Sequence, residues 1–177
     1  WQAVVLGGGV INGISQLGLW PAERVAEIIA GVPNGEMRWE RTLQLAASMT
    51  DDEQVRSGTR YDALRMIALA GWEERGEHLL RYLQDGVLDE LQMGAVSGLA
   101  DIQADQVANA LIERLPHLSA RNQKLATDGL LRTEQRSLAT LQAIEANRVS
   151  KAMFDQKAFL EHSSPRVREL AKRVLDE

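Results

Sequence analysis

Apolar residues recur along this chain at the spacing of one helix face. Between positions 104 and 115 they fall three or four residues apart, at Ala104, Val107, Ala108, Leu111, Ile112 and Leu115. The segment 167–175 repeats this spacing, and the segment 88–99 follows it more sparsely. Such spacing gathers apolar side chains on one side of a helix, whereas a half-buried strand alternates apolar and polar residues. No stretch longer than a few residues alternates in that way, so the pattern predicts an all-α fold.

Short motifs predict where several helices begin. Ser164 followed by Pro165 fits an N-cap and a first helical residue, where the missing amide hydrogen of proline costs nothing. Pro21 fits the same pattern. Thr50 and Glu53 fit a capping box, in which each side chain accepts an otherwise unpaired amide hydrogen, so we expect a helix to begin there. Helix breaks are expected at 31–35, at Gly71 and at 115–116.

The helices repeat along the chain with a period of 31 to 32 residues. Four alanines that head equivalent stretches, Ala63, Ala95, Ala126 and Ala158, lie 32, 31 and 32 residues apart. The segment 78–83 matches 110–115 at an offset of 32, and the final unit carries a Val-Arg-x-x-Ala core from Val167 to Ala171. A helix pair of this length has too little apolar surface to fold alone and gains stability by stacking on its neighbours. We therefore predict a HEAT-like α–α solenoid of antiparallel helix pairs.

The expected organisation is a single helical-repeat domain over residues 1–177. It comprises N-terminal helices in 1–50 and helix-pair repeats at 51–86, 87–117, 118–148 and 149–177. The chain length suits one domain with a proper core. The longest apolar stretch near the start is too short to span a bilayer, so we expect a chain without a membrane span.

Charge and composition narrow the functional classes. The net charge is −5 with no basic excess, which disfavours a nucleic-acid partner, because phosphate neutralisation supplies most of that affinity. The chain has no cysteine, which removes disulfides, zinc–thiolate sites and covalent haem attachment. We expect no cofactor and no metal in this chain. Absence of cysteine is compatible with the cytoplasm and the periplasm alike.

A glycine run from Gly7 to Gly13 is the most conspicuous candidate for phosphate binding. It lacks the Gly-Lys-Ser/Thr ending of a phosphate loop and the spacing of a dinucleotide fingerprint. We instead predict a helix in which Gly9 and Gly13 allow a neighbouring helix to approach closely.

Other candidate chemistry is scattered. The three histidines, His78, His117 and His162, lie on different repeats rather than in the local pairs typical of zinc ligands. Carboxylate groups at 51–53, 73–74 and 89–90 are expected at helix starts, where they complement the helix dipole. The four tryptophans are expected to pack in the interior rather than to form an aromatic ligand platform. We therefore predict no catalytic, cofactor or metal residues.

One charged group remains as a candidate site: Arg60, Tyr61, Asp62 and Arg65. Asp62 lies three residues before Arg65, within reach along a helix. The favoured interpretation is a polar clamp between repeats, and the alternative is a recognition surface.

Two strings resemble a known family. The segments 58–66 (GTRYDALRM) and 90–99 (ELQMGAVSGL) are similar to the helical-repeat region of PVC-type haem-binding proteins, large bacterial proteins that join a dehydrogenase-like propeller, a HEAT-like segment and a cytochrome c-type domain. The family's CxxCH haem motif has no counterpart in this cysteine-free chain. The resemblance implies a module of a redox protein that is periplasmic or otherwise exported, with haem only in a separate downstream domain, while the sequence itself leaves a cytoplasmic location open.

We expect a non-catalytic scaffold or protein-interaction module that links or docks domains of such a protein. Its partners would be neighbouring domains of the same polypeptide or another protein. The alternatives are a helical-repeat enzyme acting on nucleic acid, similar to a DNA glycosylase, and a stand-alone regulatory adaptor. The net charge of −5 argues against the first.

Overall fold

Helices make up the regular structure of this chain. The computed structural model describes residues 1–175, and no strand occurs among them. The expectation of an all-α fold is thus confirmed. By their contacts the helices separate into two compact units, Trp1–Ala104 and Asp105–Glu177.

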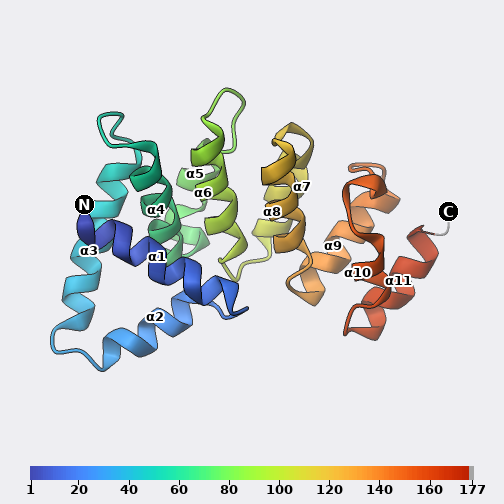
Figure 1. Ribbon diagram of the computed structural model, residues 1–177. Coiled ribbons are helices and arrows are strands. Elements are labelled where there is room, and N and C mark those ends of the chain that lie inside the picture. The colour runs from blue at the N-terminus through green and yellow to red at the C-terminus, as the bar shows by residue number, and fades with distance from the viewer. Residues whose placement is uncertain (176–177) are drawn as a thin grey trace. The chain divides into compact units, whose positions relative to one another are not determined.

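The first unit contains six α-helices and one short 3-10 helix among the described residues. They are α1 (Gln2–Gln16), α2 (Pro21–Ala30), α3 (Gly35–Thr50), α4 (Ser57–Ile67), η1 (Ala68–Ala70), α5 (Trp72–Arg81) and α6 (Asp89–Ala100). Helix α4 is the centre of this unit, because α1, α3 and α6 all pack against it (Figure 1). Its side chains Leu64, Met66 and Ile67 are almost completely buried.

The second unit contains the remaining helices of the described chain. They are α7 (Gln106–Arg114), η2 (Leu115–His117), α8 (Ala120–Leu130), α9 (Glu134–Glu145), η3 (Lys151–Met153), α10 (Gln156–Leu160) and α11 (Pro165–Leu175). Helix α9 packs against α7, α8 and α11. Leu111, Leu130 and Leu141 are fully buried in this unit.

Most helix boundaries follow the local sequence. Pro21 and Pro165 occupy the first residue of α2 and α11, as the motifs predict. Helix α2 ends at Ala30 and α3 begins at Gly35, across the expected break. Gly71 has a φ of +83°, a conformation that side chains other than glycine rarely adopt, and it separates η1 from α5.

The capping box at Thr50 is a wrong prediction. Thr50 is the last residue of α3, and the next helix begins only at Ser57. The Thr50 hydroxyl donates a hydrogen bond of 2.8 Å back to the carbonyl of Ala47 within α3. The carboxylates of 51–53 therefore follow a helix end, whereas those of 73–74 and 89–90 do lie in the first turns of α5 and α6. A threonine hydroxyl can pair at either end of a helix, so the motif alone did not fix the direction.

The glycine run forms the middle of α1, but different glycines make the close contact. A Cβ on Gly7 would meet the side chain of Met66, and a Cβ on Gly8 would meet that of Asp62, both on α4. Nothing lies within 4 Å of the positions that a Cβ would take on Gly9 or Gly13. The prediction that Gly9 and Gly13 approach a neighbour is wrong, because the helix turns these two toward the opposite side.

Candidate functional site

Exposed large apolar side chains gather on the first three helices. Of the eleven among the described residues, nine lie between residues 1 and 45, and only Leu88 and Leu160 lie elsewhere. We call these nine the N-terminal apolar surface: Trp1, Leu6, Val10, Leu17, Leu19, Ile28, Val32, Met37 and Leu45. A large exposed apolar area on a folded protein is a typical mark of a binding surface.

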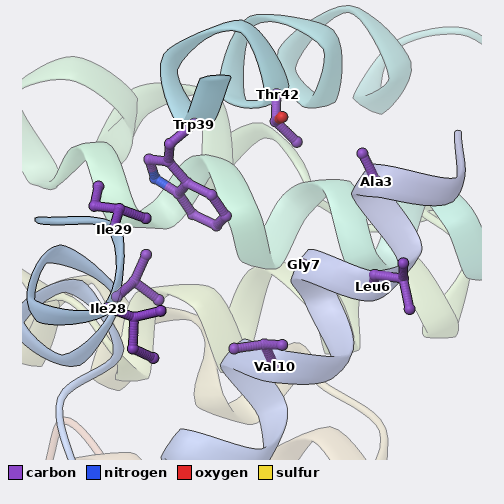
Figure 2. Close-up of a pocket in the computed structure, with 9 residues that line it drawn as sticks. Ala3, Leu6, Gly7, Val10, Ile28, Ile29, Trp39 and Thr42 are labelled. Carbon is purple, nitrogen blue, oxygen red and sulfur yellow. The ribbon is translucent and has the colours of Figure 1, made fainter. Parts of the chain in front are cut away.

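A hollow of about 310 Å³ lies within this surface. Its lining comes from three helices: Ala3, Leu6, Gly7 and Val10 of α1, Val25, Ile28 and Ile29 of α2, and Trp39 and Thr42 of α3. Figure 2 shows the Trp39 ring reaching from α3 toward the isoleucines of α2 and Val10 of α1. Apart from the Thr42 hydroxyl, every side chain of the lining is apolar or is the indole of Trp39. Such a hollow can hold an apolar side chain or helix face, and no ionisable side chain contributes to its lining.

The tryptophans depart from the expectation of interior packing. Trp1 is 68% exposed, and Trp39 is partly exposed at the wall of the hollow. Sequence reasoning did not find this surface. One feature of the sequence could have indicated it: the segment from Gln2 to Gln16 has no charged residue. A helix without a charged side is normally buried on more than one side, so a single packing partner would leave apolar side chains exposed.

The predicted site residues all lie on α4, where Arg65 donates a 3.5 Å hydrogen bond to the Tyr61 hydroxyl, but their main contacts go to different helices. The Arg60 side chain donates a hydrogen bond of 2.8 Å to the carbonyl of Thr50, which ties α4 to the end of α3. Tyr61 lies against α6, where a Cβ on Gly94 would come within 3.1 Å of both its ring and its carbonyl. The structure thus places these two residues at contacts between helices of the first unit.

Arg65 forms a buried ion pair with Asp101 instead of the expected pair with Asp62. Its Nη2 lies 2.7 Å from Asp101 Oδ2, and the two side chains are 4% and 6% exposed. Arg65 also donates to Asn12 Oδ1 at 2.9 Å and to Ser15 Oγ at 2.9 Å. Ser15 in turn donates to Asp101 Oδ2 at 2.7 Å. This cluster joins α1, α4 and the end of α6. Both terminal nitrogens of Arg65 are bound to side chains of the cluster, whereas the buried Arg65 Nε has no hydrogen-bond partner.

Asp62 lies beside α1 and is half-buried. Burial raises the pKa of its carboxyl group above the ordinary value, the charge of Arg65 opposes that rise, and the charge of Glu90 adds to it. Asp62 has no hydrogen-bond partner among the described residues. Asp62 lies at the edge of the contact between α1 and α4, and its carboxylate is not held by hydrogen bonds.

A second polar cluster, which sequence reasoning missed, links the end of α3 to α5. The Tyr82 hydroxyl lies 2.5 Å from the Thr50 carbonyl and 2.6 Å from Asp51 Oδ1. His78 Nε2 lies 3.1 Å from both Thr50 Oγ1 and Asp51 Oδ1. Burial acts to raise the pKa of Asp51, but the hydrogen bonds from Tyr82 and His78 outweigh it, and the pKa lies below its ordinary value.

The geometry of this second cluster does not suit nucleophilic catalysis. The Thr50 hydroxyl hydrogen is committed to Ala47, and a carboxylate only accepts, so His78 must carry its hydrogen on Nε2. A catalytic histidine uses one ring nitrogen for the nucleophile and the other for the carboxylate that orients it. Here the same nitrogen faces both groups. The cluster therefore serves to fasten α5 to α3.

The remaining candidate chemistry is dispersed. Among residues 1–175 no three histidine or carboxylate side chains come together in a way that could hold a metal ion. None of the helices in that range has the length and apolar character needed to cross a bilayer. Comparison of the chain with protein-family models, with curated proteins and with solved structures found no match.

Proposed function

We propose that this chain is a non-catalytic scaffold or protein-interaction module that binds through its N-terminal apolar surface. The observation that carries the proposal is that nine of the eleven exposed large apolar side chains of the described residues lie within residues 1–45, and that three of these nine, Leu6, Val10 and Ile28, line one apolar hollow. Burying such side chains against a partner is favourable by roughly 25 cal/mol for each Å² removed from water. Interface cores are built from this combination of aliphatic and tryptophan side chains with few charges.

The chemistry of the hollow favours binding over catalysis. General acid–base and nucleophilic mechanisms need an ionisable or nucleophilic group beside the bound molecule. Thr42 is the only hydroxyl in the lining, and no ionisable side chain contributes to it. The Arg65–Asp101 and Asp51–Tyr82 clusters of the first unit lie elsewhere, and their polar groups join helices.

We further propose that the helices stack as HEAT-like pairs. Two α-helices lie in each of the four segments 51–86, 87–117, 118–148 and 149–177. In a stack, equivalent helices of successive pairs lie side by side. The contacts of α4 with α6 in the first unit, and of α9 with both α7 and α11 in the second, follow this rule.

The resemblance to PVC-type haem-binding proteins suggests the setting of such a module. In that setting the chain links or docks domains of an exported redox protein, and its partner is a neighbouring domain or a separate protein. This part of the proposal depends on the resemblance alone.

Photo-cross-linking in cells tests the binding surface. A photoreactive amino acid in place of Leu6 should give a discrete cross-linked protein product. The same residue in place of Leu88, which is also an exposed leucine, at 61%, but lies outside the surface, should not. Equal products from both positions, or none from Leu6, would contradict the proposal.

A further inference from the structure

The outer side of α1 is unusual for a surface helix. Its inner side buries Val4, Ile11 and Ile14 in the first unit. Its outer side carries Leu6, Gly9, Val10 and Gly13, and Leu17 follows directly after the helix. These five positions fall on one side of the helical turn and are all exposed. Leu6 and Leu17 are 70% and 75% exposed. A helix with apolar residues on both sides is normally buried on both.

We propose that the outer side of α1 pairs antiparallel with α1 of a second copy of this chain. The inference builds on the proposed function, because it names the partner that covers part of the N-terminal apolar surface. In a twofold dimer the same patch meets itself, so a patch of one charge would repel its counterpart. The outer side of α1 avoids this, because no residue from Gln2 to Gln16 is charged. The charges of this region lie on α2 and α3.

The order of large and small residues favours this antiparallel arrangement. With the twofold axis between Gly9 and Val10, Leu6 of one copy lies opposite Gly13 of the other, and Val10 lies opposite Gly9. Each large side chain then faces a glycine, beside which the structure has open space. A parallel arrangement would instead set Leu6 against Leu6 and glycine against glycine, which leaves the large side chains in conflict and the small ones with a gap.

The pairing also gives cover to Leu17. In the antiparallel register Leu17 of the second copy comes level with Gln2 and Ala3, and Ala3 lines the hollow. Leu17, which is 75% exposed in the single chain, would thus lie beside the part of the hollow that Ala3 lines.

Site-directed disulfide cross-linking tests the pairing. Because the chain has no cysteine, a single introduced cysteine can form a disulfide only with its counterpart in a second copy. Gly9→Cys places the two thiols within about one residue of each other along the helix axis. Leu17→Cys places them ~22 Å apart, because the register separates them by 15 residues at 1.5 Å each. Oxidation should therefore give a covalent dimer with Gly9→Cys and little with Leu17→Cys. Preferential cross-linking of Leu17→Cys would overturn the register.

Sedimentation equilibrium of the unmodified chain completes the test. We expect a reversible dimer, weakened about tenfold or more by Leu6→Asp and unchanged by the matched variant Leu88→Asp. A chain that stays monomeric throughout the concentration series overturns the inference. If the Leu6 photo-cross-link then captures a different protein, the proposed function stands and only the second copy is rejected. If it captures nothing, both proposals fail.

Discussion

Leu111 shows how strongly single side chains hold the second unit together. It is fully buried in α7, and Val107 and Ile112 of the same helix are buried beside it. Glu113 of the same helix is exposed and forms only a 3.6 Å ion pair with the exposed Arg148. The predicted apolar side of this helix includes Leu111 and not Glu113, in agreement with the burial of the first and the exposure of the second.

Leu111→Ala should destabilise the chain by roughly 2–5 kcal/mol, because it removes buried methyl groups and leaves a cavity. Glu113→Ala should change the free energy of unfolding by about 0.5 kcal/mol or less, because exposed ion pairs contribute little. Chemical denaturation of the two variants measures both effects. A larger loss for Glu113→Ala than for Leu111→Ala would mean that the buried side of α7 is misassigned.

In the first unit, the buried ion pair of Arg65 and Asp101 is a polar interaction on which stability depends. Asp101 follows the last residue of α6, an unfavourable place for a carboxylate because a helix end carries partial negative charge. The guanidinium of Arg65 and the Ser15 hydroxyl compensate for this.

Asp101→Ala should therefore cost about 3–5 kcal/mol, since it leaves the buried Arg65 charge without its partner. Ser15→Ala removes the two hydrogen bonds that its hydroxyl makes with Arg65 and Asp101 and should cost about 1–2 kcal/mol. Urea unfolding followed by circular dichroism compares the two variants. Equal effects would show that the ion pair adds nothing beyond an ordinary hydrogen bond.

At the scale of elements, α1 is fixed by its two inner glycines. Gly8→Ala should destabilise the chain by about 1–3 kcal/mol, because the new methyl group would overlap the Asp62 side chain. Gly9→Ala has open space and should stabilise α1 by about 0.5–1 kcal/mol through the better helix propensity of alanine. Thermal unfolding at high dilution distinguishes the two. A destabilising Gly9→Ala would mean that the inner and outer sides of α1 are reversed.

The sequence predicted the positions of helices better than it predicted the contacts between them. Pro21, Pro165 and Gly71 are local signals that correspond to observed helix boundaries, and the apolar spacing of 104–115 corresponds to helix α7. The pairing of Arg65 with Asp101 could not be read this way, because the two residues lie 36 positions apart. The spacing along one helix indicated Asp62, three residues before Arg65, as its partner instead. The apolar hollow was missed for the same reason, since it needs the mutual positions of α1, α2 and α3.

At the scale of the whole molecule, the two compact units carry different spectroscopic signals. All four tryptophans, at positions 1, 20, 39 and 72, belong to the first unit. Leu111→Ala weakens the second unit. The unfolding transition of this variant followed by tryptophan fluorescence should therefore keep the denaturant midpoint of the unsubstituted chain. The transition followed by circular dichroism should begin at a lower denaturant concentration, because the second unit loses its helices first. Coincident shifts of both signals would show that the units unfold as one.

The central claim is that side chains from separate helices form one surface for one protein partner. The most direct test places a photoreactive amino acid at Ile28 on α2 and measures the yield of the cross-linked product in cells. The yield is compared between two variants, one with a second substitution within the N-terminal apolar surface and one with a second substitution outside it. Leu6→Asp, on α1, should abolish most of the product, because it puts a charge into the apolar contact. Leu88→Asp should leave the yield unchanged. Equal yields in the two backgrounds would contradict the claim, since Leu6 and Ile28 would then not share a partner.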